Sequence, residues 1–177
     1  MERLYDFRCW RELIMNDVTK ILANSDRFNA AEVTVETQLT IERFLHQQAE
    51  YLDEKQWEKW LSLFSNDGHY WMPAEEDQTE GAGVPNIFWE NIDMMKMRIQ
   101  RNEHPQAHSQ APQNRLCHVV SNVIIESQDE NKNIIVRSRF HCAEYFRYDV
   151  RNFTGKYRHY LEKNNNGYKI KLQRTDL

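Results

Sequence analysis

In the sequence IIVRSRFHC, at positions 134–142, apolar or small side chains alternate with cationic or imidazole ones from Val136 onward. Successive side chains of a β-strand point to opposite faces of its sheet, so this alternation predicts a strand with one buried face. The predicted buried face carries Ile134, Val136, Ser138, Phe140 and Cys142. The polar face carries Arg137, Arg139, His141, Tyr145 and Arg147. Arginine and tyrosine are enriched at protein interfaces, so the polar face is a candidate docking surface.

Further strands are predicted around this one in the C-terminal third of the chain. Runs of β-branched and aromatic residues indicate strands at 116–126, 134–148, 153–163 and 168–173. The run Asn164-Asn165-Asn166-Gly167 predicts a hairpin between the last two. In the final strand, alternation sets Tyr168, Ile170 and Leu172 against Lys169, Lys171 and Gln173. Consecutive strands with short turns predict an antiparallel sheet.

The preceding part of the chain is helical in pattern. Apolar residues spaced three and four apart predict amphipathic helices at 4–22 and 35–52. A short helix is then expected, with Asp53 as its N-cap and Gln56 at capping-box spacing, followed by a brief strand at 69–72. A third helix is predicted after Asn91, its expected N-cap. Helices first and strands later is the α+β pattern, with the helices covering one face of the sheet.

The amphipathic pattern nearest the N-terminus has a single apolar stripe. Its members are Leu4, Phe7, Trp10, Ile14 and Val18, ending at Ile21 or Leu22. We therefore expect an N-terminal helical extension over residues 1–33 and one α+β domain over 34–177.

Composition excludes several classes of protein. The 177 residues carry a net charge of -4 at pH 7, which gives no electrostatic basis for binding nucleic acid or an anionic membrane. Aromatic residues make up 12% of the chain, which favours a folded domain over disorder. No apolar run has the length of a membrane span, and the first residues lack the apolar core of a signal peptide. Three cysteines fit no disulfide or zinc framework, which predicts a cytoplasmic location.

The sequence contains no recognisable motif for a metal site or for a catalytic cysteine. His104 and His108 are four apart, but Pro105 disfavours the helix that would place them on one face. The Cys-x-His and Cys-x-x-His pair of a Rieske cluster is missing. Cys117 and His118 are adjacent on a strand, as are His141 and Cys142, so neither pair can face one side of the sheet. We predict no metal ligands and no catalytic cysteine in this chain.

Acid–base chemistry is the alternative that the residues leave open. An α+β cone can hold a pocket between its sheet and its long helix, where Tyr51, Asp53 and one histidine could form an acid–base set. The candidate histidines are His69, His118 and His141. This alternative predicts a stand-alone dehydratase or isomerase, and a ligand-binding cone without catalysis is a further one.

A set of motifs, taken together and in order, resembles the small (beta) subunit of aromatic-ring-hydroxylating oxygenases. The resemblance covers about residues 35–177. It is carried by YLDEKQWEKWLSLF at 51–64, Asp67, YWMP at 70–73, residues 93–99, RLCHVVSNV at 115–123, FTGKYRH at 153–159 and GYKI at 167–170.

This resemblance implies an NTF2-like, SnoaL-like (cystatin-like) α+β cone. It also implies a mainly structural subunit, without catalytic residues or iron ligands of its own, in aromatic compound catabolism. The partner would be a large alpha subunit with a Rieske [2Fe–2S] cluster and mononuclear Fe(II), fed from NAD(P)H through a separate reductase. The expected assembly is an α3β3 hexamer, with the small subunits self-associating into a trimer.

Within that resemblance, the polar strand face becomes the expected contact with partner subunits. The expected interface residues are Arg115, His118, Asn122, Arg137, Arg139, His141, Tyr145 and Arg147. The particular aromatic substrate stays open, because the resemblance places substrate choice mostly in the large subunit.

Overall fold

The computed structural model describes residues 33–104 and 113–177. The predicted helix at 4–22 lies outside the described residues. The long helix α2 spans Val35–Asp53, as predicted, and is followed by the short helix α3, Trp57–Ser62. Strands β1, Phe64–Pro73, and β2, Asn86–Asn91, lead to helix α4, Ile92–Glu103. The chain closes with β3, Arg115–Gln128, β4, Ile134–Phe146, β5, Asp149–Asn164, and β6, Gly167–Asp176.

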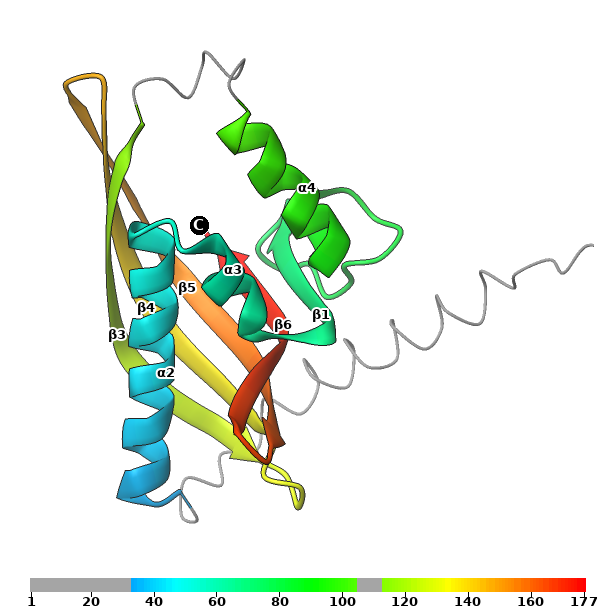
Figure 1. Ribbon diagram of the computed structural model, residues 1–177. Coiled ribbons are helices and arrows are strands. Elements are labelled where there is room, and N and C mark those ends of the chain that lie inside the picture. The colour runs from blue at the N-terminus through cyan, green and yellow to red at the C-terminus, as the bar shows by residue number, and fades with distance from the viewer. Residues whose placement is uncertain (1–32, 105–112) are drawn as a thin grey trace, which may run out of the picture.

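The six strands form one sheet in the order β2-β1-β6-β5-β4-β3. The sheet curves around α2, and α3 and α4 lie on that same side (Figure 1). This is the α+β cone that the sequence predicts. The sheet is mixed, however, because β1 pairs with β6 in parallel while every other neighbouring pair is antiparallel.

Three local predictions need correction. Strand β2 was not predicted, since its six residues lie between a loop and a helix. Strand β1 is longer than the expected 69–72, and Asn66-Asp67-Gly68 lies within it. Asp53 is the last residue of α2, and Gln56 is the N-cap of α3 without a side-chain capping bond. By contrast, Asn91 caps α4 as predicted, its Oδ1 accepting from the Met94 N–H at 3.0 Å.

The strand alternation at 134–142 is confirmed. Ser138, Phe140 and Cys142 are buried, whereas Arg139 and His141 are exposed. The buried face packs against the helices, and we call it the inner face of the sheet. Its core contains Ile41, Leu45, Trp60, Phe64, Met95, Ile134, Val136, Leu161 and Ile170.

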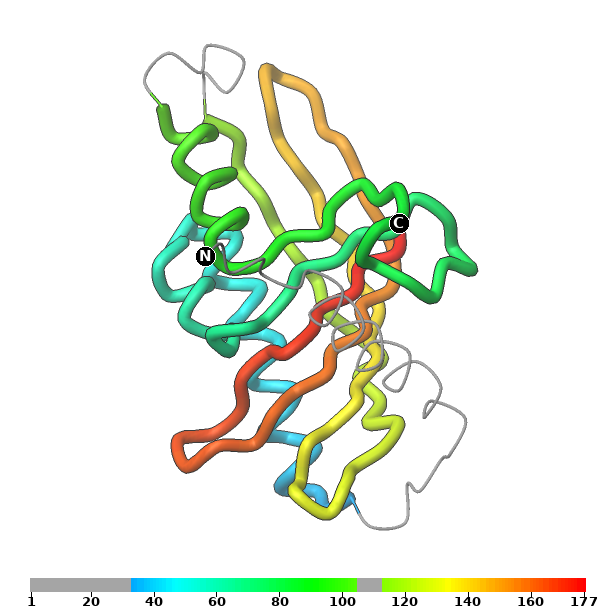
Figure 2. Tube along the Cα trace, turned by 90° about the vertical axis from the view of Figure 1, so that its right-hand side faces the viewer, coloured from blue at the N-terminus to red at the C-terminus, as the bar shows by residue number. Residues whose placement is uncertain are grey.

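The opposite side, which we call the outer face, carries the polar residues of β4. Loop 74–85 between β1 and β2 stands on this side, away from α3 and α4 (Figure 2). The inner face therefore holds the core, and the outer face is available for other contacts. No helix in residues 33–104 and 113–177 is long and apolar enough to cross a membrane.

Candidate functional site

Asp53 and His118 meet where the C-terminal end of α2 lies against β3. His118 lies on the inner face of β3, and its Nδ1 is 2.5 Å from Asp53 Oδ1. The other carboxylate oxygen of Asp53 accepts the His118 backbone N–H at 2.8 Å. Because β3 is the edge strand, this N–H has no further strand to bind, and Asp53 satisfies it. Asp53 thus joins the end of α2 to β3, and this contact takes the place of the predicted helix cap.

The space beside this pair is very small. The cavity next to His118 measures about 10 Å³ and is lined by Gln48, Val120, Tyr157 and Gln173 among others. A cavity of that size holds about one water molecule. The Tyr51 ring packs beneath Lys59 Nζ, 5.8 Å from its centroid, and no hydrogen bond within the described residues joins it to the pair.

The other two candidate histidines lie away from the pair, on the outer face. His69 stacks on Trp89 with ring centroids 4.9 Å apart. His141 Nε2 lies 3.1 Å from Asn152 Oδ1. Of the predicted acid–base residues, the structure therefore brings together only Asp53 and His118.

A buried polar cluster that the sequence did not indicate lies further inside the cone. Gln48 of α2 donates to Gln173 Oε1 at 2.7 Å, and its own Oε1 is 3.1 Å from His159 Nε2. His159 is fully buried, and this burial lowers its pKa to about 3. The imidazole is thus neutral at physiological pH, and it braces α2 against the sheet.

Alternation predicts Gln173 on the face opposite Tyr168, Ile170 and Leu172. In the structure Gln173 does lie opposite Leu172, but it shares a face with Tyr168 and Ile170. The β5–β6 register shifts at Tyr160/Leu161, because Lys171 is an extra residue in β6. A bulge of this kind reverses the alternation beyond it. Leu172 therefore moves to the outer face and Gln173 to the inner face, where it joins the polar cluster.

The middle of the outer face is organised by one buried carboxylate. Glu126 Oε2 accepts from Arg158 Nε at 3.0 Å, and Arg158 Nη2 lies 2.9 Å from the same oxygen. Arg137 Nε lies 3.3 Å from Glu126 Oε1. The two arginines come from neighbouring strands, so a single acidic side chain holds both of them in place.

Arg174 fixes loop 74–85 as a wall beside these residues. Its guanidinium pairs with Asp176 at 2.7 Å, donates to the carbonyl oxygens of Glu76 and Gln78, and lies 4.6 Å from the Trp71 ring centroid. Glu76 then pairs with Lys156 of β5 at 2.5 Å. Lys156 holds the pKa of this exposed carboxyl below its usual value. The loop is therefore tied to the sheet at several points.

Between the loop and the strands lies a groove of about 840 Å³. Its lining includes Asn122, Arg137, Arg139, Lys156 and Arg158 together with Glu76, Asp77, Glu126 and Asp176. Within residues 33–104 and 113–177, Arg139 is the groove cation that forms no ion pair. Asn122 has a left-handed φ of 52° at the irregularity where the β3–β4 register shifts. We call this feature the outer groove.

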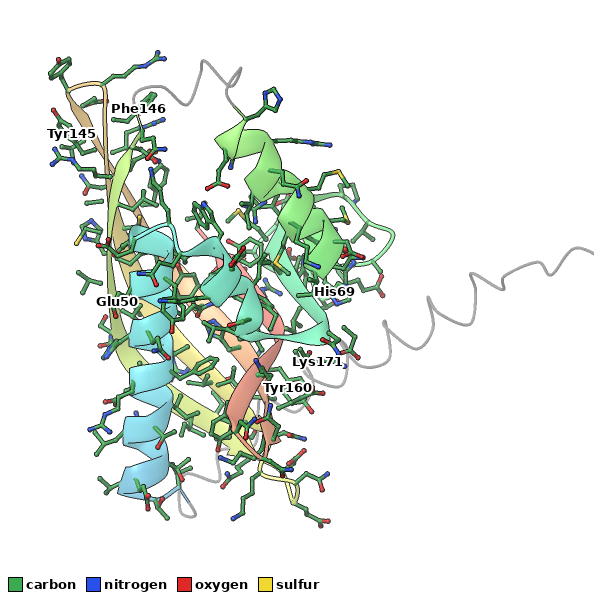
Figure 3. The ribbon with its side chains drawn as sticks, in the orientation of Figure 1. Glu50, His69, Tyr145, Phe146, Tyr160 and Lys171 are labelled. Carbon is green, nitrogen blue, oxygen red and sulfur yellow. The ribbon has the colours of Figure 1, made fainter. Side chains whose placement is uncertain are left out.

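The β4–β5 hairpin carries the remaining polar-face residues to the end of the sheet. Tyr145 and Phe146 lie at its tip (Figure 3). The Arg115 guanidinium stacks 4.6 Å from the Tyr145 ring, and that of Arg147 lies 4.8 Å from the Phe146 ring. Tyr148 in the turn is 95% exposed. Arginine paired with exposed aromatic rings is the composition of interface hot spots.

The predicted interface residues are thus distributed over three places. Asn122, Arg137 and Arg139 line the outer groove, Arg115, Tyr145 and Arg147 lie at the hairpin tip, and His141 lies between them on the outer face. His118 faces the cone interior instead. Sequence reasoning missed Glu126, Lys156, Arg158 and Arg174. The same alternation applied to β5 would have placed Lys156 and Arg158 beside Arg139 and Arg137.

The described residues also show the state of the cysteines and the potential metal ligands. Cys142 is buried, which raises the pKa of its thiol to about 11, so it packs as a small apolar residue as predicted. Cys117 is exposed on the outer face. In the described part of the chain, no group of three or more His, Cys, Asp or Glu is placed to hold a metal ion.

Comparison with known families agrees with this architecture. The family model for the ring-hydroxylating beta subunit matches residues 47–177. The chain belongs to the ring-hydroxylating beta-subunit family. Toluate 1,2-dioxygenase subunit beta of Pseudomonas putida is 30% identical over 117 residues, which cover 63% of this chain and 72% of that protein. Benzoate 1,2-dioxygenase subunit beta of Acinetobacter baylyi is 29% identical, with 61% and 66% covered.

A solved structure supports the fold. The beta subunit of the benzoate 1,2-dioxygenase from Burkholderia mallei aligns with a TM-score of 0.68 at 24% identity, covering 82% of this chain and 91% of that one. The predicted resemblance to ring-hydroxylating beta subunits and the NTF2-like fold are thereby confirmed. As a beta subunit, the chain is one part of a multi-subunit oxygenase and has an alpha partner.

Proposed function

We propose that this ring-hydroxylating beta subunit is the mainly structural component of an aromatic dioxygenase, and that its outer face contacts the partner subunits. The observation that carries this proposal is the outer groove. It is cationic on the strand side, is walled by a loop that Arg174 fixes, and contains one arginine, Arg139, without an ion pair among the described residues. A preformed groove of this kind suits a partner segment that brings a carboxylate.

The catalytic groups belong to the partner in this proposal. The alpha subunit carries the Rieske [2Fe–2S] cluster and the mononuclear Fe(II), and a separate reductase delivers electrons from NAD(P)H. Three alpha and three beta chains form an α3β3 hexamer in the cytoplasm, with the beta chains associating as a trimer. The substrate class is aromatic, in line with the toluate and benzoate of the relatives' names.

Co-expression with the alpha subunit tests the docking surface. Arg139→Glu replaces the unpaired positive charge with a negative one beside Glu76 and Asp77 in the groove, so a partner carboxylate is repelled. We expect the apparent Kd for the alpha subunit to rise at least about tenfold, measured by gel filtration and by turnover of the reconstituted oxygenase. Arg43→Glu makes the same charge change on the exposed side of α2 and serves as the control.

Two results would contradict the proposal. If Arg139→Glu and Arg43→Glu bind the alpha subunit with the same apparent Kd, the outer groove is not part of the interface. Native mass spectrometry that shows unequal numbers of alpha and beta chains would overturn the stoichiometry.

A stand-alone dehydratase or isomerase is the second candidate, and the contact between Asp53 and His118 is the observation that favours it. The cavity beside His118 has room for about one water molecule, so a substrate of the size of an aromatic ring does not fit there. The same volume argues against a ligand-binding cone. Turnover of a small substrate by the purified chain, lost in Asp53→Asn with folding intact, would reverse this ranking.

A further inference from the structure

The β4–β5 hairpin extends beyond the end of β6, and we call residues 143–155 of this hairpin the hairpin arm. Strand β5 pairs with β4 from Asp149 onward, whereas its pairing with β6 begins only at Lys156. Residues 149–155 therefore have a neighbouring strand on one side only. At about 3.3 Å per residue, this leaves about 23 Å of unpaired strand edge. Figures 1 and 2 both show the arm projecting past the end of β6.

Backbone groups at this edge point away from β4. Alternate residues of an antiparallel strand bond to opposite neighbours, and a two-residue turn is closed by a bonded pair, here Phe146 and Asp149. The N–H and C=O groups of Val150, Asn152 and Thr154 are therefore directed to the free edge. The Val150 N–H agrees with this, because it donates to the Asp149 side chain at 2.9 Å. Within residues 33–104 and 113–177, the outward groups of Asn152 and Thr154 have no hydrogen-bond partner.

The edge of the arm lacks the protection that the outermost strand β3 has. Sheet edges in native proteins usually carry a device that prevents pairing with another chain. On β3, side chains of α2 act in this way, because Asp53 accepts the His118 N–H and Gln38 donates to the Val123 carbonyl oxygen at 3.0 Å. The edge at 149–155 contains no proline, and its register with β4 continues without a bulge. A further strand can therefore pair with it.

The turn at the end of the arm indicates a role beyond folding. Arg147 and Tyr148 have left-handed φ values of 50° and 70°, as in a type I′ turn, where Asn-Gly is the favoured pair. Bulky side chains are strained in this conformation, so hairpin formation alone does not account for them. Both side chains are exposed, and they place a cation and an aromatic ring at the end of the free edge.

We infer that an extended, acidic segment of the alpha subunit adds a strand along residues 149–155 and contacts Arg147 and Tyr148 at the tip. In this mode of recognition, main-chain hydrogen bonds supply affinity and side-chain contacts supply specificity. Val150 and Phe153 are 56% and 39% exposed on opposite faces of the arm, so an added strand covers apolar surface on both. The inference rests on the proposed function for its partner.

Charge favours an acidic partner over a second copy of the arm. The arm and the β3 residue paired with it carry more cations than anions: Arg115, Arg147 and Arg151 against Glu144 and Asp149. Pairing two such edges would bring the cations of both chains onto one narrow ribbon, and like charges on neighbouring strands are destabilising. A segment with carboxylates instead gains ion pairs at the same positions.

The arm is also continuous with the proposed docking surface. Arg139 and Lys156 are partners across β4 and β5 in the outer groove, and the next outward-facing pair along these strands is His141 with Thr154. One partner subunit can therefore contact the groove and the arm together.

Two substitutions of Asn152 test strand addition. Asn152→Pro removes an outward N–H but no bond to β4, so the hairpin should tolerate it while the added strand is lost. Asn152→Ala keeps that N–H and removes the side-chain contact with His141. We expect the apparent Kd for the alpha subunit to rise at least about tenfold in Asn152→Pro and less than about twofold in Asn152→Ala. Equal binding by the two variants would overturn the inference.

Hydrogen exchange gives a second readout that needs no variant. In the free chain, the amides of Asn152 and Thr154 should exchange quickly, and those of Arg151 and Phe153, which bond to β4, should exchange slowly. In the complex with the alpha subunit, the first two should slow at least about tenfold. Unchanged exchange in the complex would overturn the inference. Protection that already appears in the beta chain alone and rises with its concentration would assign the edge to a second copy, which also overturns it.

These results separate strand addition from docking in the groove. Weaker association in Arg139→Glu but not in Asn152→Pro would keep the outer groove as the docking surface and overturn strand addition. The reverse result would support strand addition and remove the groove from the interface.

Discussion

The two faces of the sheet are built from alternate residues of the same strands, but different interactions stabilise them. On the inner face, Leu161 and Ile134 are completely buried beneath α2 and α3, and hydrophobic packing dominates. On the outer face, Glu126 and Arg174 are almost as buried, but ion pairs and hydrogen bonds hold them. The difference indicates that the inner face maintains the fold, while the outer face presents a shaped, charged surface.

The largest expected effect comes from the inner face. Leu161→Ala removes a fully buried side chain and leaves a cavity, so the free energy of unfolding should fall by about 2–5 kcal/mol. Val119→Ala, on the exposed outer face of β3, should change it by less than about 0.5 kcal/mol. Urea unfolding followed by circular dichroism measures both. Similar losses in the two variants would show that the faces do not differ as described.

A smaller effect is expected from the ion pairs of the outer face. Glu126→Ala leaves Arg137 and Arg158 without their shared carboxylate, so the free energy of unfolding should fall by about 1.5–3 kcal/mol. Glu130→Ala, in the exposed turn after β3, is the matched control and should have little effect. If Glu126→Ala is as neutral as its control, the buried carboxylate does not organise this face.

The polar cluster inside the cone should make stability depend on pH. His159 has a pKa of about 3 in the folded chain and about 6.5 when unfolded, so below pH 6.5 the unfolded state binds the extra proton. Stability is therefore full above pH 6.5 and falls as the pH falls, by about 1.4 kcal/mol per unit below pH 5.5. Glutamine does not titrate in this range, so His159→Gln should lose this pH dependence. The difference between the pH profiles of the two proteins' free energy of unfolding then gives the contribution of His159. Parallel profiles would show that His159 titrates normally.

Local patterns in the sequence were sufficient for much of this fold. Alternation in 134–142 correctly gave the buried and polar faces of β4, and Asn164–Gly167 gave the last hairpin, with Gly167 at a positive φ of 130°. The parallel pairing of β1 with β6 could not be predicted in this way. Those strands come from distant parts of the chain, and no local pattern records which strands become neighbours.

The candidate site was predictable in type but not in detail. The polar face of β4 was identified from its arginines, yet the outer groove also needs Glu126 from β3 and loop 74–85, which only the folded sheet brings together. Asp53 fits the spacing of a helix cap equally well, and only the position of His118 on the edge strand shows its actual partner. The bulge at Lys171 reverses the face of Gln173, and alternation alone does not reveal a bulge.

The smallest effect on folding is expected at the tip of the β4–β5 hairpin. Here a substitution should affect association with the partner subunit rather than the free energy of unfolding. Tyr148 is 95% exposed, so Tyr148→Ala should change the free energy of unfolding by less than about 0.5 kcal/mol. If the tip contacts a partner subunit, the same variant should weaken association with the alpha subunit about fivefold or more, because exposed tyrosines are frequent interface hot spots. Leu39→Ala, which shortens a half-exposed side chain on α2, should alter neither quantity by a comparable amount. Unchanged association in Tyr148→Ala would restrict the docking surface to the outer groove, and an equal loss in Leu39→Ala would extend it to the helical side.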